Sequence, residues 1–222
     1  MPAPEIVSHA QENGKTLGHV NLMVRHPHPS SRDHSTRSQV DTLIANATID
    51  DLRAITRNLL ATGTPSLAAS FTAAARSRLR QTNAKRIATT NGLFATGIDG
   101  IHAVPTPELQ NVLARARSLY GAGMGFTSLI VLAMVVKATV GLRWERDGVM
   151  ADSLATIDAD VSQAIQSCKE ELEGGRVNDL AAAREAINKM RAGVEDSCRD
   201  VEIWGGEFPF DRAANSIECW RI

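Results

Sequence analysis

The chain has 222 residues, a net charge of −1 and 43% hydrophobic residues, which is enough apolar material for one globular domain with a buried core. Its three cysteines, Cys168, Cys198 and Cys219, are odd in number, far apart and never in a CxxC pair, so they indicate neither a disulfide framework nor a zinc site. The first residues lack the basic start and apolar core of a secretory signal. We therefore expect reduced thiols and a cytoplasmic or nuclear protein.

Charge is unevenly divided along the sequence. Residues 1–117 hold 13 lysines and arginines against 8 aspartates and glutamates, whereas residues 118–222 hold 11 against 17. Such asymmetry can indicate a nucleic-acid or membrane contact, or two parts that attract each other within a fold or across a dimer. We favour the last, because it needs no further partner. Nucleic acid is not an expected partner, since the basic stretch 76–86 has no interleaved aromatic residues for base stacking.

Residues 1–39 are predicted to be a disordered arm. They contain four prolines, five of the six histidines and no apolar period sustained over two turns. His26 and His28 alternate with prolines and have no cysteine or carboxylate cluster beside them, so we expect no metal site there. No cofactor is predicted for the protein, and no residue of the chain is assigned as a metal ligand.

A helical hairpin is expected over residues 40–80. Leu52, Ile55 and Leu59 fall on one face of a first helix, and Pro65 occupies the first turn of a second. The two helices are separated by a short turn containing glycine, which is typical of an antiparallel pair.

The same hairpin resembles the helix pair of the fungal nuclear proteasome-tethering family. In that family a Leu-Arg pair opens an amphipathic helix, a Pro-Leu step follows and a second helix continues. The positions in this chain are Leu52-Arg53, Leu59, Pro65 and Leu67, while Thr64 stands where the family has a histidine. The resemblance covers residues 40–80 and implies a role in tethering proteasomes at the nuclear envelope. The rest of the chain resembles filamentous-fungal proteins without an assigned function.

Residues 81–105 are expected to form a long loop, because asparagine, glycine and threonine replace the helix formers and no period holds. His102 lies in this loop without a partner acid or nucleophile nearby in sequence, which favours a packed or solvent-facing histidine over a catalytic one. If the protein binds a small ligand, we expect the pocket to lie between this loop and the glycine-rich turn that follows the next helix. The candidate pocket residues are Gly121, Gly123, Gly125, His102 and Trp144.

Residues 106–222 are predicted to form the main bundle, with two long amphipathic helices at its end. The apolar stripe of the first runs from Met150 through Cys168 to Leu172, and that of the second runs from Leu180 through Cys198 to Val201. The uncharged run 118–136 is long enough to cross a bilayer, and Gly121 with Gly125 forms the small-xxx-small pattern of packed membrane helices. Its serine, threonine and glycine residues, together with the one-sided apolar stripes of the neighbouring helices, favour a central helix of a water-soluble bundle.

Aromatic residues are concentrated near the end of the chain, where four of the nine lie. Aromatic residues in a short irregular segment either dock back on the bundle or anchor a partner, and we favour docking because exposing them in a monomer is costly. Together with two arginines of the second hairpin helix they are the candidate partner-binding residues: Trp204, Phe208, Phe210, Trp220, Arg76 and Arg80.

These patterns predict an all-α fold, a bundle of about six helices with a central apolar helix, in one domain over residues 40–222 behind the arm. The expected function is that of a non-catalytic scaffold or adaptor that binds another protein, with a homodimer as one form. Two alternatives stay open: an enzyme or small-ligand-binding protein with the pocket described above, and a membrane-associated helical protein. No catalytic residue is assigned.

Overall fold

A computed structural model describes residues 31–83 and 92–220 of the chain. Eight helices and two short strands occupy these ranges, so the predicted all-α class is confirmed. In chain order they are α1 (Ser31–Asn46), α2 (Ile49–Thr62), α3 (Pro65–Asn83), β1 (Phe94–Thr96), β2 (Ala103–Pro105), α4 (Pro107–Gly121), α5 (Gly125–Lys137), α6 (Val149–Glu173), α7 (Leu180–Trp204) and α8 (Asp211–Glu218).

The chain divides into two compact units, residues 1–59 and 60–222. In the first unit, residues 1–30 of the predicted arm lie outside the described residues, and α1 begins at Ser31, inside the segment assigned to the arm. The two predicted hairpin helices are found as α2 and α3. α2 begins as expected, because the Asp51 backbone N–H donates to Thr48 Oγ1 at 3.1 Å and acidic residues occupy its first turn.

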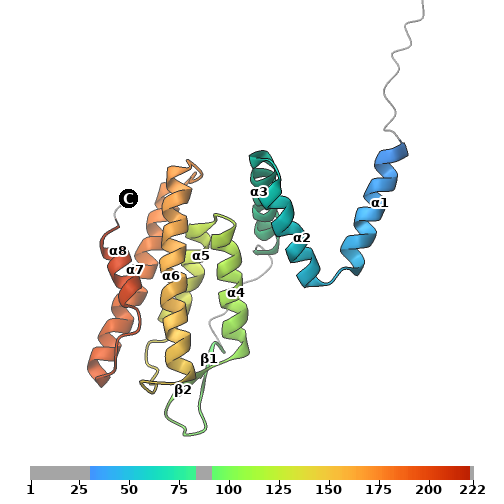
Figure 1. Ribbon diagram of the computed structural model, residues 1–222. Helices are drawn as coiled ribbons and strands as arrows, with labels where there is room; N and C mark the ends of the chain where they lie inside the picture. The colour runs from blue at the N-terminus through green and yellow to red at the C-terminus, as the bar shows by residue number, and fades with distance from the viewer. Residues whose placement is uncertain (1–30, 84–91, 221–222) are drawn as a thin grey trace, which may run out of the picture. The chain divides into compact units, whose positions relative to one another are not determined.

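The centre of the second unit is α5, which packs against α4, α6 and α7 (Figure 1). Nine of its thirteen residues are buried, and the exposed ones, Thr127, Ile130 and Lys137, lie along one side of the helix. Leu129, Leu132 and Val135 have no exposed surface. Burial over most of its circumference explains why most of the surface of this helix is apolar. The predicted central apolar helix is therefore confirmed.

The uncharged run 118–136 does not form one continuous helix. α4 ends at Gly121 and α5 begins at Gly125, and between them Gly123 adopts a φ of +71°, a conformation that only glycine adopts without strain. Gly125 itself lies against α6, where an added Cβ would be 2.4 Å from the backbone nitrogen of Cys168. Among the residues that the structure describes, no helix is long and apolar enough to cross a membrane.

The two long helices α6 and α7 run in opposite directions (Figure 1), and each packs on α5. The apolar stripe predicted for α6 is buried from Met150 to Cys168. On α7 the prediction needs two corrections. Leu180 is half-exposed, because it begins the helix, and Ser197 rather than Cys198 faces the core, where its hydroxyl lies 3.4 Å from Thr139 Oγ1.

A short antiparallel β-hairpin lies inside the segment predicted to be a loop. β1 pairs with β2 so that Ala95 lies opposite Val104. Leu93 is buried, and the Ala103 backbone N–H donates to the carbonyl oxygen of Arg143 at 2.7 Å, which fixes the hairpin to the segment between α5 and α6. Strands of three residues are too short for an alternating pattern to identify them in the sequence.

α4 and α6 are joined by a polar contact in which Asp160 of α6 is almost fully buried. Arg117 donates to its two oxygens from Nε and Nη2 at 2.8–3.0 Å, and the Tyr120 hydroxyl donates to Oδ1 at 3.0 Å. Burial raises the pKa of Tyr120, and Asp160 raises it further. Three donors therefore replace the water that the buried carboxylate has lost.

Replacing Gly125 with alanine should destabilise the protein by about 3 kcal/mol, because the new Cβ meets the backbone of α6, which cannot move aside like a flexible side chain. The matched control is Gly121→Ala, where nothing lies within 4 Å of the new Cβ; there we expect no loss and a gain of up to about 1 kcal/mol. Urea unfolding of the two variants measures the difference. Equal stabilities would contradict the close approach of α5 and α6.

Replacing Asp160 with asparagine should cost about 2–3 kcal/mol of unfolding free energy, because it removes the charge that Arg117 faces in a mostly buried position. Tyr120→Phe removes one hydrogen bond to the same carboxylate and should cost about 1 kcal/mol. Chemical unfolding tests both, with Asp196→Asn as control, since the exposed pair of Asp196 with Arg199 should contribute less than about 1 kcal/mol. A cost at Asp160 no larger than at Asp196 would refute the role of this contact.

Candidate functional site

An open cleft of about 980 Å³ lies between the first half of α6 and the segment that follows α7. Its walls carry the side chains of Trp144, Trp204 and Phe208, and its lining includes both cationic and anionic side chains. Arg146 pairs with Glu207 at 3.1 Å in the same lining. The cleft therefore combines apolar ring faces with a polar border, the composition typical of binding sites for small amphipathic groups.

Trp204 lies in a closely packed position in the wall of this cleft. Its indole packs edge-on against Trp144, with ring centroids 5.1 Å apart, and the Arg143 guanidinium lies 5.3 Å from the Trp204 ring centroid on another side. Gly206 lies so close that an added Cβ would be 2.1 Å from the indole. The buried Nε1 of Trp204 has no hydrogen-bond partner among the described residues. An acceptor atom of a ligand or a water molecule would satisfy this donor.

Asp158 of α6 forms the base of the cleft and holds α8 in place. It is buried, and its Oδ1 accepts from the Ala213 backbone N–H at 2.8 Å, so it caps the start of α8 from a different helix. Burial raises the pKa of the Asp158 carboxyl, while the backbone N–H groups of Ala213 and Arg212 oppose the shift. The cleft wall and the docking of α8 therefore depend on the same carboxylate.

The four aromatic residues near the end of the chain dock on the bundle. Phe210 and Trp220 are buried, and Trp220 stacks on Phe126 with centroids 5.9 Å apart. Phe208 packs edge-on against Phe210 and lines the cleft with Trp204. A partner would reach Phe210 or Trp220 only if α8 left the bundle. Of the candidate partner-binding aromatics, Phe208 and Trp204 alone line an open cavity.

The predicted ligand pocket is not assembled at one place. Gly121, Gly123 and Gly125 lie at the end of α4, whereas His102 precedes β2 near the other end of that helix. A helix of 15 residues separates these ends by roughly 22 Å. Of the predicted pocket residues, Trp144 lines the cleft described above.

The two candidate arginines of α3 have different surroundings. Arg76 is half-buried, and its Nη1 donates to the Ala122 carbonyl oxygen at 3.2 Å, so it covers the end of α4. Arg80 is exposed. Arg76 therefore has a structural role in the second unit, and Arg80 is the one of the two that a partner could contact directly.

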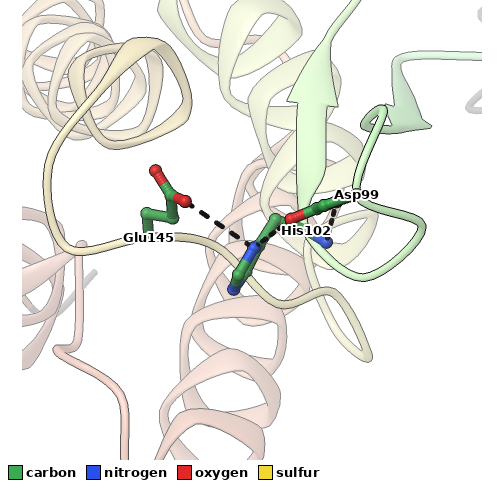
Figure 2. A group of neighbouring side chains, drawn as sticks. All are labelled: Asp99, His102 and Glu145. Carbon is green, nitrogen blue, oxygen red and sulfur yellow. Dashed lines mark hydrogen bonds and ion pairs between the residues drawn. The ribbon is translucent and has the colours of Figure 1, made fainter.

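A second group of polar residues lies at the tip of the β-hairpin (Figure 2). His102 Nδ1 is 2.5 Å from Asp99 Oδ2 and 3.9 Å from Glu145 Oε1. The backbone N–H groups of Ile101 and His102 both donate to Asp99 Oδ1, which, together with the His102 side chain, lowers the pKa of Asp99 to about 2. The carboxylate of Asp99 is thus ionised at any physiological pH.

Sequence reasoning treated His102 as isolated and missed both of its carboxylate neighbours. Asp99 precedes it by three residues in a turn with two glycines, a spacing that could have indicated a side-chain pair in a tight turn. Glu145 is distant in sequence and comes close only because the hairpin pairs with the segment at Arg143. No local pattern could have predicted that contact.

The thiols and the cleft differ in what chemistry they offer. Burial raises the pKa of the Cys168 thiol, which makes it a packed side chain rather than a nucleophile. The lining of the cleft contains no histidine, cysteine, serine or lysine side chain. Its aromatic rings and charged groups are suited to binding through ring stacking and charge, and its carboxylates are those of Asp147, Asp158, Glu207 and Asp211.

Replacing Asp158 with alanine should destabilise the protein by about 1–2 kcal/mol, because the Ala213 N–H at the start of α8 loses its acceptor. Asp158→Asn keeps an oxygen acceptor and removes the buried charge. Because burial raises the pKa of Asp158 in the folded state, the wild type loses stability as the pH rises from below the ordinary value of about 3.9 through the raised one.

The asparagine variant lacks this loss, so its stability relative to wild type should improve as the pH is raised from 3 towards 7. Urea unfolding at a series of pH values measures the difference. A parallel dependence in both proteins would contradict the burial of a charged Asp158, and equal destabilisation by alanine and asparagine would show that the charge itself holds α8.

Comparison of the chain with known proteins finds no matching family model, no matching curated protein and no matching solved structure.

Proposed function

We propose that the chain is a non-catalytic helical scaffold or adaptor that binds protein surfaces through α1 and α2. The observation that carries the proposal is a set of large apolar side chains, each between 46% and 61% exposed: Val40, Leu43, Ile44, Ile49, Ile55 and Leu59. None of the fourteen residues of α2, all of which the structure describes, is buried. An apolar face of this kind on a helix is typical of a protein-interaction surface.

The first unit also has a place where a partner's side chain would fit. Leu43 and Ala47 of α1, with Ala54 and Ile55 of α2, line a shallow hollow of about 440 Å³ between the two helices. Small and branched apolar residues at such a hollow are suited to receive a side chain from a third helix. We name this hollow and the exposed apolar residues around it the N-terminal apolar face.

The partner that we assign to the N-terminal apolar face is a second copy of the chain. Helices of 16 and 14 residues are marginal in water by themselves, so α1 and α2 gain most of their stability by covering their apolar sides. Pairing the same face of two copies would cover both sets at once, as in a two-fold symmetric dimer. The positive balance of residues 1–117 and the negative balance of residues 118–222 would add attraction between copies.

Two narrower readings follow from other features. The resemblance of residues 40–80 to the proteasome-tethering family would make the proteasome a further partner and place the protein in the nucleus. Three free cysteines are in keeping with a cytoplasmic or nuclear protein. Binding of a small aromatic or apolar ligand in the cleft is the second candidate function, favoured by the unpartnered Nε1 of Trp204. A membrane-associated role gains no support from the helices described above.

The double substitution Ile44→Asp with Ile55→Asp should reduce the mass of the full chain in solution from about twice 23.9 kDa to 23.9 kDa, because two charges would lie in the apolar contact. Light scattering behind size-exclusion chromatography over a concentration series measures the mass. Ile203→Asp is the matched control, since Ile203 is 82% exposed on α7 and outside the N-terminal apolar face; it should leave the mass unchanged.

A wild-type chain that has a mass of 23.9 kDa at every concentration would overturn self-association. If that monomer also lost thermal stability in the double variant, the N-terminal apolar face would be covered by the protein's own second unit, and the proposed interaction surface would be wrong. A mass that falls equally in the Ile203 control would place the contact elsewhere.

A further inference from the structure

The tip of the β-hairpin places three side-chain ligand atoms of two kinds near one point (Figure 2). One oxygen each from Asp99 and Glu145 and a ring nitrogen of His102 all lie within 4.8 Å of one another. Donor atoms around a tetrahedral zinc ion, at about 2.0–2.2 Å from it, are roughly 3.4 Å apart. On metal binding, the distance between His102 Nδ1 and Asp99 Oδ2 would increase from 2.5 Å, and the distance between His102 Nδ1 and Glu145 Oε1 would decrease slightly from 3.9 Å. Rotation of the exposed side chains allows both changes.

The backbone holds these side chains in position. Asp99 Oδ1 accepts from two backbone N–H groups, so its other oxygen is directed to His102. The Gly97 N–H donates to the His102 carbonyl oxygen at 2.7 Å and closes the turn. Glu145 follows Arg143 by two residues, and the Arg143 carbonyl oxygen is bonded to Ala103 of the hairpin. The ligands therefore come from two segments that a main-chain hydrogen bond already holds together.

The contacts within the cluster leave negative charge unmatched. His102 Nδ1 carries at most one proton, and Asp99 is near enough to accept it. Glu145, at 3.9 Å from the same nitrogen, has no such bond to His102, and its side chain is 72% exposed. Two carboxylates beside one imidazole favour a bound cation, because a metal ion can accept electron pairs from all three groups at once.

We propose that Asp99, His102 and Glu145 form a surface site for a divalent transition-metal ion of the zinc class, which links the tip of the β-hairpin to the segment between α5 and α6. One imidazole with two carboxylates is a ligand set that suits zinc, whereas calcium and magnesium prefer oxygen ligands alone. Water would complete the coordination, since the His102 side chain is 36% exposed. The site is independent of the N-terminal apolar face and of the dimer assigned to it.

Calorimetric titration of the full chain with zinc chloride, after treatment with a chelator, tests the proposal. We expect one equivalent of zinc to bind the wild type and its affinity to fall by at least about tenfold in His102→Gln. Glu145→Gln should also weaken binding, and neither calcium chloride nor magnesium chloride should bind with comparable affinity. Zinc should raise the melting temperature of the wild type and leave that of His102→Gln unchanged.

Two control variants separate this site from other zinc ligands in the chain. The double variant His26→Gln with His28→Gln removes the two closely spaced histidines of the RHPHP segment, and Cys219→Ser removes the exposed thiol. Both should bind zinc as the wild type does. Loss of the zinc equivalent in either control, or retention of full affinity in His102→Gln, would overturn the proposal. Equal small losses in all the variants would mean unspecific binding and would overturn it as well.

Discussion

α5 lies between α4, α6 and α7, and each of these helices buries its apolar side against it. The helix can occupy this position because its surface is apolar except on the exposed side that carries Thr127 and Lys137, and because glycines allow close approach. Gly125 meets the backbone of α6, and Gly193 of α7 lies where an added Cβ would be 3.4 Å from the Ala133 carbonyl oxygen. The buried hydroxyl of Ser128 on α5 donates to Ala116 of α4 at 2.9 Å, so it carries no desolvation penalty. At about 1.5–3 kcal/mol for each large side chain removed from water, α5 supplies much of the stabilisation of the unit.

Two buried carboxylates of α6 then fix the elements at its sides. Asp160 binds Arg117 and Tyr120 of α4, while Asp158, two residues earlier, accepts from the start of α8. Residues two apart on a helix point in different directions, so one helix can hold neighbours on two sides. An apolar side chain could fill either position, but it would not fix the angle of α8 or the register of α4. Polar contacts therefore define the geometry, and apolar burial provides the free energy.

Periodicity predicted the helices of the bundle because it reports which face of each helix is buried. The stripe of α6 from Met150 to Cys168 and the apolar run of α5 both follow from this principle. It could not predict the hairpin, whose strands have three residues each, nor the partners of His102, because one of them, Glu145, is brought close by a contact between distant segments. Periodicity also did not predict the cleft, because the cleft depends on the glycines that follow Trp204 and on the contact between Trp204 and Trp144. Sequence patterns identify burial; they do not identify which distant side chains meet.

Not every apolar side chain of the structure is covered and not every buried polar group has a hydrogen-bond partner, and these exceptions are the candidates for function. Most large apolar side chains of the bundle helices are covered, and their buried carboxylates have donors, whereas the N-terminal apolar face is half-exposed and Trp204 Nε1 lacks a partner. The segment from Arg143 to Glu145 connects Trp204, whose Nε1 has no partner, with the polar cluster at His102. Arg143 lies over Trp204 in the cleft wall, and Glu145 faces His102 at the hairpin. A cation at the hairpin would hold Glu145 and so restrict this segment, and Trp144 in the cleft would be restricted with it. The wall of the cleft and the cluster at the hairpin therefore share one segment of three consecutive residues, Arg143 to Glu145.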